Sequence, residues 1–223
     1  MNWAPHRTGD VVRSLQILVL ISVCFPSHAA LCGPIHDAVR KGDQAKIVAL
    51  LQQNPELVFS RDKFGNTPLH VAAQHNKPAI AALLLANGAD VNARIGSENR
   101  VSGVTNAGET PLTLALNSYQ HKEMVELLLT HGAEVNVLSS GTTPLFLAVN
   151  RNLPDDVELL LANGADPDGQ LLVHFAVLHD RVKILEILLD YGADPNGKDW
   201  AGHTALYYAN GKAAALLSAH GGR

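Results

Sequence analysis

The amino-acid sequence predicts an all-α protein, an elongated solenoid of about six helix-turn-helix-loop repeats that follows a short N-terminal segment. Three observations predict this fold. A six-residue motif returns at a period close to 33 residues, a glycine-containing motif follows four of its copies at a constant distance, and apolar runs of helical length lie between them. A fixed period in this range is typical of stacked repeats, in which each unit buries its faces against its neighbours.

The first motif predicts the start of a helix in each unit. It reads Thr-Pro-Leu-His-Val-Ala at residues 67–72, and its first positions along the chain are spaced by 34, 43, 33, 28 and 33 residues. A threonine hydroxyl accepts a free backbone N–H of the first helical turn, and proline is tolerated at the next position because its missing N–H would have no partner there. The copies, several of them altered, begin at Gly33, Thr67, Thr110, Thr143, Leu171 and Thr204.

The second motif predicts the end of each second helix. It has the form Gly-Ala-Asp/Glu, and its glycine follows the start of the first motif by 21, 22, 21 and 21 residues. A helix commonly ends in a left-handed residue that glycine adopts at little cost. The four glycines are Gly88, Gly132, Gly164 and Gly192. Breaks in the apolar pattern around Asn76, Asn152 and Asp180 predict a short turn between the two helices of a unit.

These residues resemble the ankyrin repeat family. The resemblance rests on the Thr-Pro-Leu-His openings, the leucine triplets at 83–85, 127–129 and 159–161, and the Gly-Ala-Asp endings, and it covers about residues 33–223. It implies an ankyrin-type solenoid that acts as a binding scaffold for another protein. It does not name the partner, because one fold serves many unrelated functions.

The period divides residues 30–223 into one repeat domain. The predicted units are 33–62, 63–94, 107–138, 139–169, 170–198 and 199–223, with an inserted loop at 95–106. The inserted loop has two readings, a part of the binding face or a tolerated flexible connection. The connection between Asp166 and Leu171 is five residues shorter than the period, which predicts one missing finger-like loop. The charged first unit and the alanine-rich helix at 212–220 are expected to cap the stack.

Residues 1–29 have the features of a secretory signal peptide. Arg7 and Arg13 precede an apolar run at 15–25, and Ser27-His28-Ala29 is a small-x-small site that predicts cleavage after Ala29, with Ala30 as the second choice. A membrane anchor would need about 20 apolar residues. We therefore expect an exported, periplasmic or secreted protein, and a bacterial periplasm is the setting that we favour.

Cysteine and charge content narrow the partner class. Only Cys32 would remain after cleavage, so no internal disulfide is expected. The leucine before Cys32 makes a poor lipidation site, so a lipid anchor is a less favoured variant.

The chain carries 17 basic and 21 acidic residues, a net charge of −4, with no basic cluster. Nucleic acid is therefore not an expected partner, since phosphate binding needs clustered positive charge. We expect a monomer that binds another protein.

Eleven histidines raise the alternative of a metal-dependent or catalytic protein that uses a histidine-rich edge. His36, His70 and His174 occupy the same slot of the first motif, which favours a repeated structural role in bonding neighbouring loops. No nucleophile elbow or phosphate-binding loop is present. We therefore expect no enzyme activity, no catalytic residue, no cofactor and no metal site.

The expected binding surface consists of the loop tips and the exposed face of the first helices, as the family resemblance implies. Phe64 and Trp200 are the most notable of its residues, because aromatic side chains dominate interface hot spots. The alternative is that both rings fold back onto the stack. The candidate partner-binding residues are Lys63, Phe64, Asn66, Gln74, His75, Glu109, Asn117, Asn150, Arg151, His179, Trp200 and His203.

Overall fold

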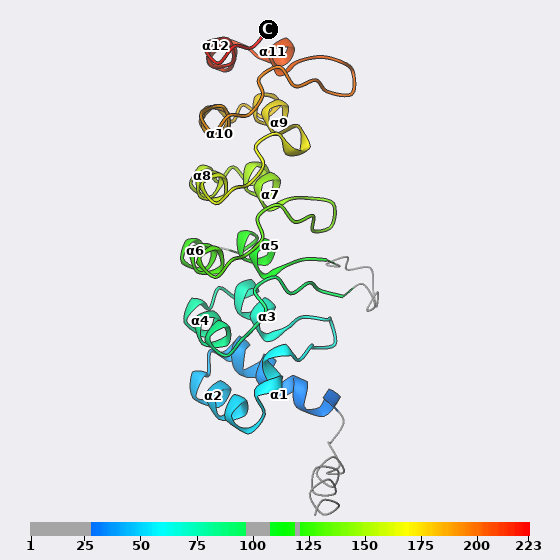
Figure 1. The fold of residues 1–223 in the computed structure, drawn as a ribbon, viewed down its shortest axis with the longest axis vertical. Helices are drawn as coiled ribbons and strands as arrows, with labels where there is room; N and C mark the ends of the chain where they lie inside the picture. The colour runs from blue at the N-terminus through cyan, green and yellow to red at the C-terminus, as the bar shows by residue number, and fades with distance from the viewer. Residues whose placement is uncertain (1–27, 97–107, 119–120) are drawn as a thin grey trace, which may run out of the picture.

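The computed structural model describes residues 28–96, 108–118 and 121–223, where the helices stack into an elongated solenoid of two rows (Figure 1). Most of the expected signal peptide and of the inserted loop lie outside these residues. The row of first helices contains α1 (His28–Lys41), α3 (Pro68–Gln74), α5 (Pro111–Leu116), α7 (Pro144–Asn150), α9 (Leu172–Leu178) and α11 (Ala205–Tyr208). The row of second helices contains α2 (Gln44–Gln53), α4 (Pro78–Ala86), α6 (Lys122–Thr130), α8 (Pro154–Ala162), α10 (Val182–Asp190) and α12 (Gly211–Ala219). Two short 3₁₀ helices, η1 (Pro55–Phe59) and η2 (Gly169–Leu171), complete the described secondary structure.

Three of the four threonines that begin a copy of the first motif cap their helices as expected, whereas Thr204 makes no side-chain cap at the start of α11. The hydroxyl groups of Thr67, Thr110 and Thr143 accept the backbone N–H three residues later, at the starts of α3, α5 and α7. In α3 the cap is reciprocal, because His70 Nδ1 accepts the N–H of Thr67 at 3.2 Å. The caps fix where each first helix starts and therefore keep the units in register.

Left-handed residues end both helices of a unit. Asn76, Asn152 and Asp180 have φ of 46°, 59° and 52° and form the turn between first and second helix. Asparagine and aspartate tolerate this conformation better than most residues. After the second helix, the expected glycines adopt φ between 83° and 88°, which confirms the predicted helix ends.

The core follows the two helix rows along the whole described stack. Leu69, Leu112 and Leu145, at the third position of the first motif, are at most 1% exposed. The second helices contribute an equivalent series of leucines that are completely buried, namely Leu84, Leu128, Leu160, Leu188 and Leu217. Each unit therefore buries apolar side chains against both neighbours, as a solenoid requires.

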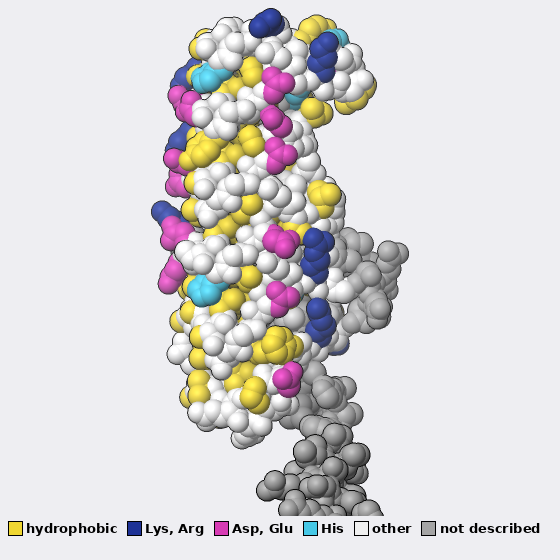
Figure 2. All heavy atoms as spheres, viewed as in Figure 1, with side chains coloured by type: hydrophobic (Ala, Val, Ile, Leu, Met, Phe, Trp, Pro, Cys, Tyr) yellow, Lys and Arg dark blue, Asp and Glu magenta, His cyan; other side chains and the backbone are white. Residues whose placement is uncertain are grey.

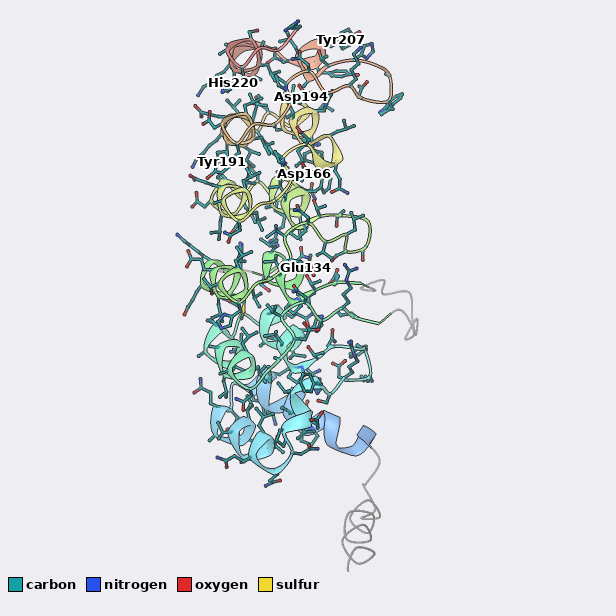
Figure 3. The ribbon with its side chains drawn as sticks, in the orientation of Figure 1. Glu134, Asp166, Tyr191, Asp194, Tyr207 and His220 are labelled. Carbon is teal, nitrogen blue, oxygen red and sulfur yellow. The ribbon has the colours of Figure 1, made fainter. Side chains whose placement is uncertain are left out.

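Asparagine side chains join the loops that follow the second helices. The Asn136 amide donates to the carbonyl of Gly164 at 2.9 Å, and its oxygen accepts the N–H of Asp166 at 2.9 Å. Asn92 and Asn196 make the same pair of bonds to the next unit. Acidic residues of these loops line up along the stack, as Glu134, Asp166 and Asp194 do in Figure 3 and as the column of acidic side chains does in Figure 2.

The loops before most first helices project from the stack as fingers, but the loop before α9 does not (Figure 1). Between α8 and α9 the chain forms only the short helix η2, as the shortened period predicts. Gln170 and Leu171 adopt left-handed φ values of 55° and 54° there. The Gln170 amide donates to the carbonyl of Gly141 at 2.7 Å, and its oxygen accepts the N–H of Thr143 at 3.1 Å. One side chain thus makes contacts that a finger makes elsewhere.

None of the helices in the described ranges is long and apolar enough to cross a membrane.

Candidate functional site: the fingers and the first-helix face

The first finger, residues 60–66, presents an exposed aromatic ring. Phe64 is 58% exposed, and the ammonium group of Lys63 lies 4.9 Å from the centre of its ring. The ring does not fold back into the core. A half-exposed aromatic side chain at a loop tip offers apolar area to a partner at a small entropic cost.

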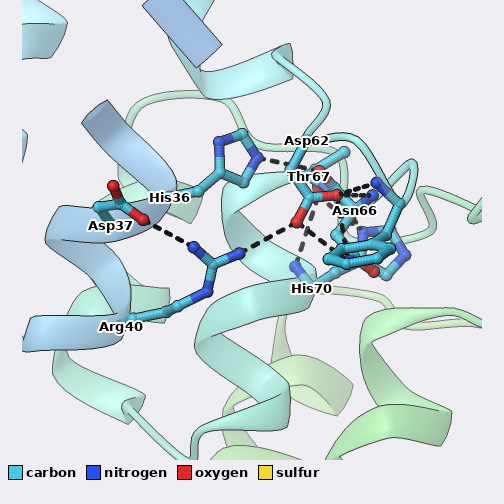
Figure 4. Close-up of polar contacts among 8 residues, drawn as sticks. His36, Asp37, Arg40, Asp62, Asn66, Thr67 and His70 are labelled. Atoms are coloured by element: carbon cyan, nitrogen blue, oxygen red, sulfur yellow. Dashed lines mark hydrogen bonds and ion pairs between the residues drawn. The ribbon is translucent and has the colours of Figure 1, made fainter. Parts of the chain in front are cut away.

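A hydrogen-bond network holds this finger in shape (Figure 4). The Asp62 carboxylate accepts the backbone N–H groups of Phe64 and Asn66 at 2.9 and 3.0 Å and pairs with Arg40 at 3.2 Å. The Asn66 amide also donates to Asp62, and the Asn66 carbonyl accepts His36 Nε2 at 2.9 Å. Asn66 therefore positions the finger, and its side chain is engaged within the loop.

The last finger has the same plan and a larger exposed ring. Trp200 is 93% exposed at the tip, while Asp199 accepts the N–H groups of Ala201 and His203 at 2.9 Å. The Tyr208 hydroxyl donates to Asp199 at 2.7 Å, and this bond lowers the pKa of the carboxyl group. The finger is rigid at its base, which leaves the Trp200 ring held out towards solvent.

Tyr207, which sequence reasoning did not select, belongs to the same surface. Its ring stacks on His203 with centroids 4.0 Å apart and planes at 7°, and it is 68% exposed. It is labelled in Figure 3 beside the last finger, where Figure 2 shows hydrophobic side chains at the surface. The available signal was a tyrosine at the fourth position of the last motif copy, where three of the other five copies have a buried histidine.

Four candidate residues come together in a groove between α3 and α5. Gln74 and His75 lie at the end of α3, Asn117 at the end of α5, and Glu109 at the base of the second finger; with Leu114, they line a cavity of about 510 Å³. Burial raises the pKa of the Glu109 carboxyl group. Burial, together with the nearby positive charges of Arg40 and Lys77, lowers the pKa of His75.

The remaining candidates lie further along the first-helix face. Asn150 is exposed at the end of α7, whereas Arg151 is half-buried because its guanidinium donates to the carbonyl of Leu116. His179 packs on Phe175, with ring centroids 4.2 Å apart. The twelve candidates therefore form an extended surface that runs from the first finger to the last, and they do not converge on one pocket.

Three buried histidines bond their first helices to the base of the next finger, in the structural role that their shared slot predicts. His36 reaches the carbonyl of Asn66, His70 that of Glu109 at 3.2 Å, and His174 that of His203 at 3.1 Å. These histidines are at most 5% exposed. Within the described ranges, no group of three or more histidine, cysteine, aspartate or glutamate residues has an arrangement that could hold a metal ion.

A His–Asp pair on the second-helix side was not predicted. His121 Nε2 lies 2.7 Å from Asp156 Oδ2, and His121 Nδ1 lies 2.9 Å from the carbonyl of Ser118. Both ring nitrogens are engaged, and the two side chains are only 11% and 9% exposed. This geometry joins the third and fourth units and offers no free nitrogen for proton transfer to a substrate.

The fold defines a repeat scaffold with an extended exposed face, and the chain belongs to the ankyrin repeat family. The family model for three ankyrin repeats matches residues 10–95 and 96–170, and the single-repeat model matches residues 168–197. Proteins of this family typically bind other proteins, and related adaptors are not catalytic.

Similar proteins come from several kingdoms. The chain resembles a crystal structure of an ankyrin repeat domain from Acinetobacter baumannii AYE, with a TM-score of 0.73 and 27% identity over 85% of this chain and 98% of that one. It is 28% identical to the probable 26S proteasome regulatory subunit p28 of Saccharomyces cerevisiae, over 82% of this chain and 83% of the relative. It is also 32% identical to inversin of Gallus gallus over 64% of this chain, but spans only 12% of that protein.

Proposed function

We propose that this chain is a non-enzymatic adaptor that binds a partner protein through its finger tips and first-helix face. The observation that carries the proposal is the pair of outward-facing rings, Phe64 at 58% and Trp200 at 93% exposure, on fingers that are rigid at the base. Rings held in this way lose little freedom on binding, which favours their use as interface anchors. Tyr207 extends the aromatic area beside Trp200.

Capture of the partner tests this function. The full chain with a C-terminal affinity tag is compared with a Phe64→Ala/Trp200→Ala variant and with Tyr191→Ala, which removes an aromatic side chain that is 41% exposed in the second-helix row. We expect one protein to be retained by the wild type and by Tyr191→Ala and lost by the double variant, with unchanged circular dichroism. Equal retention by all three would reject the finger rings as anchors.

We propose further that the adaptor works outside the cytoplasm, in a periplasm or as a secreted protein, where its partner is an envelope enzyme or a toxin. The support is the basic start, apolar run and small-x-small site of residues 1–29. Fractionation and mass spectrometry of the full chain expressed in a bacterium test this location. We expect a periplasmic protein that begins at Ala30; an uncleaved cytoplasmic protein would reject the proposal. A cleaved chain that carries lipid on Cys32 would replace it with the anchored variant.

The alternative of a metal-dependent or catalytic protein is tested by metal analysis of the purified chain. Several described histidines are bonded to fingers or to neighbouring units, and they do not form an evident set of metal ligands. We therefore expect sub-stoichiometric zinc, copper and iron. A stoichiometric metal that survives dialysis would favour the alternative.

A further inference from the structure

The groove between α3 and α5 contains a carboxylate, that of Glu109, with no partner among the described residues. Glu109 is half-buried at the base of the second finger, and burial alone raises its pKa. Within the described ranges, no hydrogen-bond donor or cation contacts its side chain. A carboxylate that is partly removed from water gains most from a cation that donates hydrogen bonds to it.

The next groove along the stack contains a guanidinium. Arg151, eight residues after the capping Thr143, donates from Nη1 to the carbonyl of Leu116 at the end of α5. Carbonyl groups in the last turn of a helix lack partners within the helix and carry partial negative charge. A guanidinium at this position therefore satisfies an acceptor between two first helices.

The α3/α5 groove has a serine in the same slot. Ser118 lies eight residues after the capping Thr110, and its hydroxyl reaches the carbonyls of Ala73 and Gln74 at 3.2 and 2.9 Å. Serine is too short to fill the groove and brings no positive charge. In the α3/α5 groove the helix-end carbonyls are therefore bonded by a neutral hydroxyl, and none of the chain's described cations lies against the Glu109 carboxylate.

We propose that the α3/α5 groove receives an arginine side chain of the partner protein, an inference that rests on the proposed adaptor function. The guanidinium would pair with Glu109 while its aliphatic stem lies along Leu114, and Gln74 and Asn117 also line the groove. Its planar fork suits a carboxylate better than the point charge of lysine does.

The positive charge at the other end of the groove does not oppose this assignment. Arg40, whose positive charge acts on His75, is already paired with Asp37 at 2.8 Å and with Asp62 at 3.2 Å. Its charge is therefore compensated within the chain. Lys77 lies beyond the end of α3, at the His75 end of the groove, so the Glu109 end is the end that attracts a cation.

Titration of the full chain by NMR with capped amino acids tests the groove. The probes are Nα-acetyl-arginine methylamide, the lysine equivalent and the uncharged citrulline equivalent, and the readouts are the Glu109 carboxyl carbon and the backbone amides around it. We expect saturable shifts with the arginine probe, weaker binding of the lysine probe and at least tenfold weaker binding of citrulline. Equal shifts with arginine and citrulline, or no shifts with arginine, would overturn the proposal.

Variants separate the groove from general charge effects. Glu109→Gln is expected to weaken arginine binding at least tenfold, whereas Glu134→Gln, an exposed acidic residue of the loop column, leaves it unchanged. Ser118→Arg places an arginine in the slot that Arg151 fills one unit later and is expected to block the probe in a folded chain. Unaltered probe binding in both Glu109→Gln and Ser118→Arg would overturn the proposal.

Arg100 lies outside the described residues, and its substitution tests whether this chain's own guanidinium competes with the arginine probe for the groove. If Arg100→Gln raises affinity for the arginine probe at least tenfold, the groove serves this chain and the partner assignment is wrong; unchanged affinity supports the partner assignment. The two proposals fail separately. A partner captured through Phe64 and Trp200 with no probe binding would reject only the groove, while probe binding together with a partner that the Phe64→Ala/Trp200→Ala variant retains equally would reject only the finger anchors.

Discussion

The carboxylate of Asp168 accepts the backbone N–H of Asp194 at 2.7 Å, in a position where other units place an asparagine. The asparagine rungs make a second bond, from the side-chain amide to a glycine carbonyl, as Asn136 does to Gly164. A carboxylate has no proton to donate, so the equivalent carbonyl of Gly192 cannot receive this bond from Asp168. Asp168 therefore makes one hydrogen bond between the fourth and fifth units, where each equivalent asparagine makes two.

Asp168→Asn is expected to stabilise the protein by about 0.5–1.5 kcal/mol, because it supplies the missing donor at Gly192 and removes a charge from an acidic column. Urea unfolding at pH 7 measures the change, with Asp168→Ala as the control that also loses the existing bond and should destabilise. An Asn variant no more stable than the Ala variant would contradict the asparagine-rung explanation.

His70 should make stability depend on pH between about 4 and 6.5. Burial lowers its pKa to about 4, because the charged ring would lose its hydration. Between those values the unfolded chain binds a proton that the folded chain does not, so stability is full above pH 6.5 and falls as pH decreases. The loss reaches at most roughly 3 kcal/mol near pH 4.

His70→Gln isolates this contribution, because glutamine can still accept the Thr67 N–H but does not titrate. Unfolding free energies at pH 7 and pH 4.5 should differ less in the variant than in the wild type, while carboxylates contribute equally to both. Parallel pH profiles would show that His70 binds its proton equally well in both states.

Leu128→Ala is expected to cost about 2–5 kcal/mol, since the side chain is completely buried in α6 and its removal leaves a cavity between units. Chemical denaturation measures the loss. Leu138→Ala is a matched control, because Leu138 is 57% exposed and the same truncation should change stability little. Similar midpoints for both variants would contradict the stacked core.

The repeat period was enough to predict most helix starts and ends of the described repeats, although α1 begins at His28, five residues before the motif copy at Gly33. Thr67, Thr110 and Thr143 cap helices, the four glycines end them, and the missing finger lies where the period shortens. These features recur because each depends on residues within one unit, so the sequence spacing carries them directly. The expected exposure of Phe64 and Trp200 could be derived only from their slots in the repeat.

Contacts between units were less predictable, because they depend on which side chains differ from one repeat to the next. The bond from Arg151 to Leu116 and the pair of His121 with Asp156 each join residues 35 positions apart, and neither arginine nor this His–Asp pair recurs at the equivalent positions of the other units. The groove lined by Glu109 and Asn117 depends on Ser118, which occupies the position where the next unit has Arg151. No period marks such pairs, so only the three-dimensional arrangement brings them together.

The missing finger supplies the last prediction. Gln170 replaces the contacts of the finger by accepting the N–H of Thr143 at 3.1 Å and the Thr143 hydroxyl at 3.2 Å, while that hydroxyl accepts the N–H of Phe146 at 3.1 Å. Thr143→Ala should cost about 1 kcal/mol through the lost cap. Gln170→Ala should cost a similar amount, and it leaves a residue with a side chain at the same left-handed position.

Because both side chains belong to one network, their effects should not add. A double-mutant cycle of Thr143→Ala and Gln170→Ala, measured by urea unfolding, is expected to give a coupling energy of about 0.5–1 kcal/mol. In that case Thr143 and Gln170 act together, and a side chain of the fifth unit helps to cap α7 in the fourth unit. Strictly additive losses would mean that Thr143 caps α7 independently and that Gln170 only anchors η2 to Gly141.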